Sequence, residues 1–507
     1  MSVATIERHQ VRVLTGVIVV FSVSAVITLA TLVTIALFAR PVADDFPAFS
    51  TIREIGWSVV GYDYSTFSGR FTNNVLYAVP YVLFGDRALW IVPIAILSTL
   101  VASLAFIGSR VNRDSRLATA TGAVLGGSAG LAVVIVQPSL FDTFAWYTSS
   151  TLYLASVAVL SLSAALIVAY RGAEGRFRMA ILVGIGFSFF VMQGLSETIA
   201  APVLGVVILA GVAVFTFARR VLREWRTPIV IAMCASLPGL LLSALAPGRA
   251  GRVSIQTLGE PIGIPAILRS AVADIPNFLH YFAGPIVLIV IAVGIGFGLV
   301  LPAMSVRTRV IVSGLSVLTS VAAVISTSAL VHYGYNGGAV PFRAWAFPTA
   351  VFVVSLVALI AVAIAGFTWW HAATVGVAGA VIVAALAGYG IGWKSLSSET
   401  VGAVVLRAQL IDARAADIGE QLKAGATTIE IMPAPVLLEA TESADYNLPG
   451  SSGPDWTDDY VAEYHGVFGI PTIPTAQQPT YCRSGFSNPY WAIRSCEELA
   501  QDRHGTR

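Results

Sequence analysis

Two adjacent carboxylates, Asp44 and Asp45, follow the first apolar run of the chain and precede Phe46. A carboxylate partly removed from water at a membrane edge has a raised pKa, and a neighbouring negative charge raises it further. Such a group can act as a general base that takes the proton from a sugar hydroxyl. Side chains alternate along an extended segment, so we expect one acid to face a cavity and the other to bind backbone or arginine. We favour Asp45 as the base; the alternative is an ordinary polar loop.

Four arginines lie in polar segments between apolar runs, beside glycines and other small residues. Guanidinium groups bind phosphate through a bidentate fork, so we predict a phosphate clamp made of Arg70, Arg249, Arg252 and Arg343. His332, before the last of these, is a further candidate contact to the ligand. The alternative is that the arginines contact lipid phosphates or pair with the acids Asp44, Glu54 and Asp63.

The segment 141–153 interleaves aromatic rings with hydroxyl side chains. This mixture suits a carbohydrate, which stacks its C–H face on rings and hydrogen-bonds through its edge. The predicted sugar contacts are Asp142, Trp146, Tyr147 and Tyr153. The alternative is an aromatic belt at the membrane interface.

Glu197 lies between two apolar runs and is an acid close to membrane depth, which favours a functional role in catalysis or substrate orientation. A plain turn residue is the alternative. The sequence has no Walker A motif, no HExxH motif and no cluster of His and Cys. We therefore expect no required cofactor and no metal site, and a divalent cation is the alternative that we keep. We also expect no nucleic-acid partner.

The elements that hold these residues must lie mostly in lipid. Of the 507 residues 56% are hydrophobic and only 11% are charged, whereas a soluble protein needs roughly a quarter charged residues to cover its surface. A bilayer core needs about 20 apolar helical residues for each span. The sequence predicts about eleven spans, near 12–38, 72–109 (interrupted at 80–87), 117–136, 151–170, 179–195, 198–218, 228–246, 282–303, 310–330, 342–366 and 372–393.

Arginine clusters give the orientation of these spans. They fall in the N-terminal segment and in alternate short connections, which the positive-inside rule places in the cytoplasm. The N-terminus is then cytoplasmic and the protein a multi-pass protein of the cytoplasmic membrane. The long loops 39–71, 137–150, 247–281 and 331–341 lie outside, together with the tail. In that oxidising compartment Cys482 and Cys496 can form a disulfide.

A change in charge marks a domain boundary near residue 393. Residues 1–393 contain 22 basic and 13 acidic residues, and residues 394–507 contain 8 and 15. We therefore predict a transmembrane domain, 1–393, and an extracytoplasmic domain, 394–507. The tail pattern predicts a helix over 398–423 and a strand over 427–432, hence a small α/β domain after an all-α membrane domain.

Taken in order, these motifs resemble an uncharacterised bacterial branch of the GT-C superfamily of integral-membrane glycosyltransferases. The resemblance covers about 50–350 and the acid pair before it. It departs from that branch at Arg249, where Asn is frequent, and at Ser196, where His often precedes the Glu. The motifs that carry it are Asp44-Asp45-Phe46, Gly69-Arg70-Phe71, the stretch from Trp146 to Tyr153, Glu197, and Pro247-Gly248 with Arg252.

The resemblance implies inverting transfer of a sugar from a polyprenyl-phosphate donor to an envelope glycan or glycoconjugate at the outer face of the membrane. Arabinofuranose is one candidate sugar, by analogy of family and lineage. A transporter or flippase of a lipid-linked glycan is the alternative, and would have ionisable groups at mid-membrane and symmetric broken helices. An acyl- or phosphotransferase would need a His, Ser or Thr nucleophile, and none stands out.

The orientation predicts that the tail is extracytoplasmic. A C-terminal fusion to alkaline phosphatase, which is active only outside the cytoplasm, should be active, and a fusion to a fluorescent protein that folds only in the cytoplasm should be dark. The opposite pair of results would invert the topology and move the acid pair to the cytoplasmic side.

Overall fold

The computed structural model describes residues 3–42, 44–112, 115–216, 225–249, 262–282, 286–334, 340–365 and 401–425, with a few residues between 379 and 390. Arg252, Cys482 and Cys496 lie outside the described residues, so the structure does not test the disulfide or the role of that arginine.

Helices make up nearly all of this described part, which contains no strand. In lipid no water satisfies backbone N–H and C=O groups, so apolar runs form helices that bond internally. The longer helices are α1 (Val3–Leu37), α5 (Ala88–Ser109), α6 (Arg116–Ile135), α8 (Ala155–Tyr170), α9 (Gly175–Gln193), α10 (Glu197–Thr216), α11 (Arg226–Ala244), α13 (Ile264–Tyr281), α14 (Val287–Val300), α15 (Val306–Gly334), α16 (Ala346–Ile364) and α18 (Gly402–Lys423). Short elements are α2 (Asp45–Ile55), η1 (Gly56–Ser58), α3 (Val59–Thr66), α4 (Phe71–Phe84), η2 (Gly85–Arg87), η3 (Phe141–Ala145), α7 (Tyr147–Ser149), η4 (Ser150–Leu154) and η6 (Phe342–Trp345).

Eight helical stretches are long and apolar enough to cross a bilayer, which makes the chain a multi-pass membrane protein. The sequence predicts eleven spans. Two of the others correspond to shorter apolar stretches, Glu197–Ile208 and Val287–Val300, and the last, 372–393, lies largely outside the described residues. The predicted count is therefore confirmed for eight spans only.

The predicted interruption within 72–109 is confirmed, because α4 ends at Phe84 and α5 begins at Ala88 after the turn η2. Although the apolar stretch Phe71–Ser109 is 39 residues long, α4 has 14 residues. A helix of that length is about 21 Å long, less than the roughly 30 Å of a bilayer core. The span is therefore α5, and α4 is a short helix that precedes it.

Close packing of α5 on α6 forms the centre of the bundle. A Cβ on Gly108 would lie 2.1 Å from the carbonyl oxygen of Gly122, and a Cβ on Gly122 would lie 2.3 Å from that of Gly108. Only glycine permits this backbone approach, as at many helix crossings in membranes. The bundle core extends from this pair to the buried segment that contains η3, α7 and η4.

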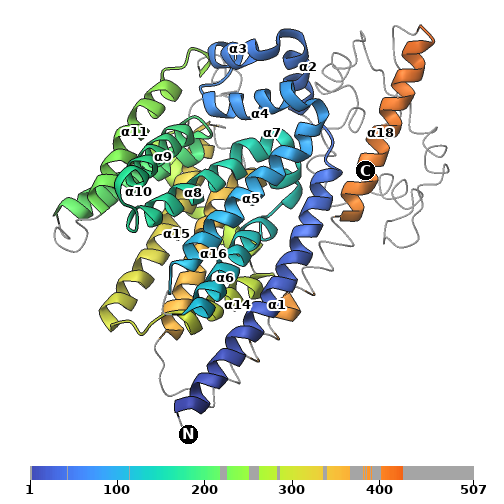
Figure 1. Cartoon of the computed structure of the whole chain (residues 1–507). Coiled ribbons are helices and arrows are strands. Elements are labelled where there is room, and N and C mark those ends of the chain that lie inside the picture. The colour runs from blue at the N-terminus through green and yellow to red at the C-terminus, as the bar shows by residue number, and fades with distance from the viewer. Residues whose placement is uncertain are drawn as a thin grey trace.

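Helices α2, α3 and α4 lie at the end of the bundle away from the N-terminus, here called the far end (Figure 1). The Phe49 ring of α2 stacks on Tyr81 of α4, with centroids 4.1 Å apart. Arg53 donates from Nε to the hydroxyl of Tyr81 at 3.1 Å, and Tyr81 donates to Asp86 at 3.1 Å. These contacts fix the segment that follows the acid pair.

Within the tail, the predicted helix is confirmed as α18, which runs beside the end of α1 in Figure 1. It ends before Gly425, whose φ of 85° is typical of a glycine that terminates a helix. The predicted strand 427–432 lies outside the described residues, so the small α/β domain is not supported.

Candidate functional site

The carboxylate of Asp45 is fully buried at the start of α2. Its Oδ2 accepts a hydrogen bond from the backbone N–H of Val42 at 3.0 Å, and its Oδ1 accepts one from the backbone N–H of Thr148 at 2.9 Å. Asp45 thus joins two segments that are 103 positions apart, the loop after α1 and the short helix α7.

Burial raises the pKa of Asp45 to about 7. The hydrogen bonds from Thr148 and Val42 oppose this effect, because they stabilise the charged form, and the charge of Asp44 adds to it. The carboxylate therefore titrates close to neutral pH.

Asp44 is exposed at the position before α2, and its side chain makes no capping hydrogen bond. One acid binds backbone and the other is exposed, but the extended segment that the sequence predicts is replaced by helical backbone, since Asp44 has φ −62° and ψ −14° and Asp45 begins α2. Asp45, which the sequence analysis favours as the base, is the backbone-bound acid and has no exposed surface. The role of Asp45 as base stays a prediction, and Asp44 is the acid of the pair whose side chain is accessible.

The predicted sugar-binding residues all lie in one buried segment. Two π-helical turns, η3 and η4, flank α7, a backbone form frequent at functional sites. The exposed fractions of Asp142, Trp146, Tyr147 and Tyr153 are 3%, 2%, 0% and 4%. These side chains do not form an interfacial belt facing lipid, nor an exposed platform for a sugar.

The buried ring of Tyr147 makes contacts with two neighbouring helices, α2 and α4. Its hydroxyl donates to the carbonyl oxygen of Tyr77 on α4 at 2.9 Å, and its ring packs 5.5 Å from that of Phe49 on α2. The segment 141–154 therefore fixes α2 and α4 relative to each other.

Arg70 and Glu197 form an ion pair, with Nε 2.8 Å from Oε2. Arg70 immediately precedes α4, and Glu197 begins α10, where the helix dipole favours a negative charge. The backbone N–H groups of Thr72 and Asn73 donate to the carbonyl oxygen of Gly194, at 3.0 and 3.1 Å. The structure thus brings together two predicted site residues, and Glu197 is a partner that the sequence did not suggest for Arg70.

Arg249 is exposed on the loop after α11, close to the loop that carries Arg70. A Cβ on Gly248 would lie 2.5 Å from the backbone nitrogen of Phe67 and 2.8 Å from that of Ser68. The glycine of this motif therefore allows the two arginine-bearing loops to pack on each other.

Arg343 lies in η6 with its guanidinium 4.4 Å from the centroid of the Trp146 ring. A cation over an aromatic face is attracted by the ring quadrupole. This contact joins two further predicted residues. Tyr147, next to Trp146, binds α4 at Tyr77, seven residues or about 10 Å along the helix from Arg70.

His332 contacts an acid that sequence reasoning missed. Its Nε2 lies 2.8 Å from Oδ2 of Asp274, an oxygen that also accepts a hydrogen bond from Ser328. Asp274 is the single acid within 262–282, a largely apolar segment. A lone acid in such a segment indicates a paired or functional residue, and this pattern could have identified it. His332 is thus placed beside a carboxylate.

Asp63 on α3, which the sequence analysis considers only as a partner for arginine, is a second perturbed carboxylate at the far end. Burial raises its pKa to about 6, and its carbonyl oxygen accepts the N–H groups of Phe67 and Ser68. Carboxylates with shifted pKa values are frequent at functional sites, and the far end has two of them, Asp45 and Asp63.

Among the described residues, no group of three or more His, Cys, Asp and Glu side chains is arranged to hold a metal ion. Comparisons of the chain with protein-family models, curated proteins and solved structures find no match. The arrangement offers an exposed carboxylate, Asp44, and arginines on elements that pack against the same buried support, which suits proton removal and anion binding at this end of the bundle.

The pKa of Asp45 predicts a pH dependence of stability. The pKa of about 7 in the folded protein exceeds the value near 3.9 of an unfolded chain, so the native state holds the extra proton between these values. Stability should then fall as pH rises from about 4 to about 7, by up to roughly 1.4 kcal/mol for each pH unit, and stay level above. In detergent, Asp45→Asn should lose this component of the melting-temperature profile, and Asp44→Asn should keep it. An unchanged profile in Asp45→Asn would contradict the assignment.

Proposed function

We propose that the protein is an inverting glycosyltransferase of the cytoplasmic membrane that uses a polyprenyl-phosphate sugar. One observation carries the proposal. At the far end, the exposed acid Asp44 stands next to the buried acid Asp45, whose hydrogen bonds fix the backbone at this position. Arg70, Arg249 and Arg343 lie on elements packed against the same support.

The reaction follows from these groups. The acceptor hydroxyl gives its proton to Asp44 as its oxygen attacks the anomeric carbon, and the bond from that carbon to the phosphate oxygen breaks on the opposite face. The polyprenyl phosphate leaves with the bonding pair. Arginine donors fixed in advance stabilise this charge without having to reorganise during the reaction.

The substrate class follows from the surroundings. The helices beside the far end expose large apolar side chains, among them Leu241, Leu242 and Leu245 of the α11 end, which suit a lipid chain. The sugar is activated by its phosphate link, so no nucleotide is needed at the site. Arabinofuranose is the sugar we would test first, with an envelope glycan or glycoconjugate as acceptor.

The placement of ionisable groups supports an enzyme over a transporter. Four ion pairs among the described residues join Arg40 to Asp412, Arg53 to Asp86, Arg70 to Glu197 and His332 to Asp274. These four pairs involve loops, helix ends or helices other than the apolar spans, whereas a transporter needs such groups in the middle of its spans.

The proposal predicts that Asp44→Asn retains the fold and donor binding and loses turnover by roughly 10²–10⁴-fold, as expected for a missing general base. Transfer is measured in proteoliposomes with radiolabelled decaprenyl-phosphate arabinofuranose and a panel of other polyprenyl-phosphate sugars. Glu54→Gln, which neutralises another exposed acid of α2, serves as the matched control and should keep wild-type turnover.

Two outcomes would count against the proposal. Wild-type turnover in Asp44→Asn would remove this acid from the mechanism. A wild-type protein that transfers sugar from none of the donors would contradict the function itself.

A further inference from the structure

Arg407 of the tail helix α18 is a charged side chain with only 2% of its surface exposed. Its Nη2 donates to the carbonyl oxygen of Pro41 at 3.4 Å, and its guanidinium lies 5.1 Å from the centroid of the Phe141 ring. Burial of a guanidinium is costly unless its contacts compensate for lost water. These contacts reach both segments that Asp45 joins, the loop after α1 and the segment 141–154.

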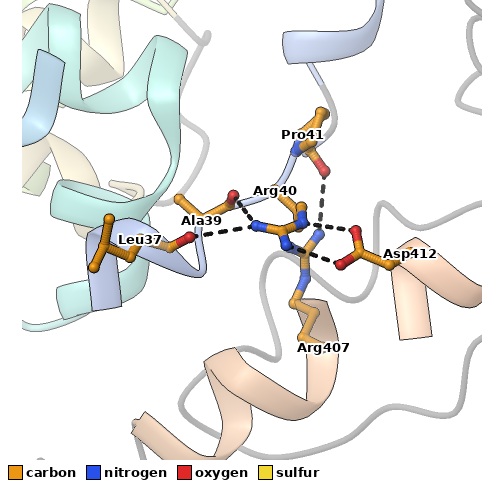
Figure 2. Close-up of polar contacts among 6 residues, drawn as sticks. All are labelled: Leu37, Ala39, Arg40, Pro41, Arg407 and Asp412. Atoms are coloured by element: carbon orange, nitrogen blue, oxygen red, sulfur yellow. Dashed lines mark hydrogen bonds and ion pairs between the residues drawn. The ribbon is translucent and has the colours of Figure 1, made fainter. Parts of the chain in front are cut away.

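A second contact lies beside the first. Nε and Nη2 of Arg40 donate to the two carboxylate oxygens of Asp412, at 2.7 and 2.8 Å (Figure 2). Arg40 also donates from Nη1 to the carbonyl oxygen of Ala39 at 3.0 Å, at the end of α1. The hydrogen bond to Asp412 raises the pKa of Arg40, so the pair stays charged. A bidentate fork fixes direction as well as distance.

Figure 2 shows Arg407 and Asp412 of α18 reaching the residues on either side of one peptide, Arg40 and Pro41. The next residue, Val42, donates its N–H to Asp45. The chain between α1 and α2 is therefore held by the tail on one side and by the buried carboxylate on the other.

We infer that Arg407 and Asp412 are positioning residues, through which α18 holds residues 40–42 so that Asp44 faces the reacting sugar. This inference rests on the proposed function and adds the tail to the site. Without the two contacts, residues 40–42 gain freedom, the Val42 N–H leaves Asp45, and Asp44 loses its direction. A misplacement of about 1 Å can cost roughly 10²-fold in rate.

The test uses the full-length protein and Asp412→Asn, a change at an exposed carboxylate that leaves the buried core intact. We expect kcat to fall about 10- to 100-fold, the donor KM to stay within about twofold, and the melting temperature in detergent to stay at the wild-type value. Glu420→Gln, at another exposed acid of α18, is the control and should match wild type.

Two further variants separate positioning from a general effect on structure. The double variant Arg40→Asp with Asp412→Arg restores opposite charges and should recover at least part of the lost kcat. Arg407→Gln should lower kcat in the same way, and its correctly folded fraction, measured by size-exclusion chromatography, corrects the rate for any misfolded protein.

Hydrogen exchange gives a readout that needs no activity. The peptide covering residues 39–48 should exchange at least about tenfold faster in Asp412→Asn and in Arg407→Gln than in wild type, because its amides lose their restraint. Wild-type exchange and wild-type kcat in both variants would overturn the inference. A wild-type protein that transfers no sugar would instead contradict the proposed function.

Discussion

The buried carboxylate of Asp45 is the constraint on which the far end of this protein depends. An acid with no exposed surface is stable only if its oxygens are satisfied, and both accept backbone N–H groups, from Val42 and from Thr148. These bonds fix the entry into α2 and the position of α7 together. The exposed neighbour, Asp44, therefore stands on a rigid support, as a reacting group requires.

The other contacts extend this support over the whole far end. Tyr147, beside Thr148, binds α4 through Tyr77, and the residue just before α4 is Arg70, which pairs with Glu197. Arg343 covers the ring of Trp146, and Arg407 covers the ring of Phe141 from the tail. Buried aromatic side chains thus act as the common base on which charged groups from distant parts of the sequence are held.

The sequence predicts the bundle better than the site. Eight of the predicted spans and the interruption at Gly85–Arg87 are confirmed. Both could be predicted because they follow from local composition. The site depends on contacts between distant segments, which local patterns do not encode. Alternation along an extended segment is not what separates Asp44 from Asp45, because Asp44 has helical backbone angles and Asp45 begins α2. Hydroxyl groups among aromatic rings suggest sugar contacts, whereas the structure buries Trp146 and Tyr147. Asp274 was missed because its partner, His332, comes from another helix, 58 positions away.

The central claim is our proposal that Asp44, together with Arg70, Arg249 and Arg343 on elements packed against the same support, forms one site for a lipid phosphate and its sugar. The most direct measurement is a cryo-electron microscopy structure in nanodiscs with a phosphonate analogue of decaprenyl-phosphate arabinofuranose, which cannot transfer its sugar. The account predicts the phosphonate within hydrogen-bond distance of at least one guanidinium among Arg70, Arg249 and Arg343, and the anomeric carbon on the side of Asp44. A phosphonate bound at the opposite end of the bundle, or at the far end with Asp44 turned away from the sugar, would contradict it.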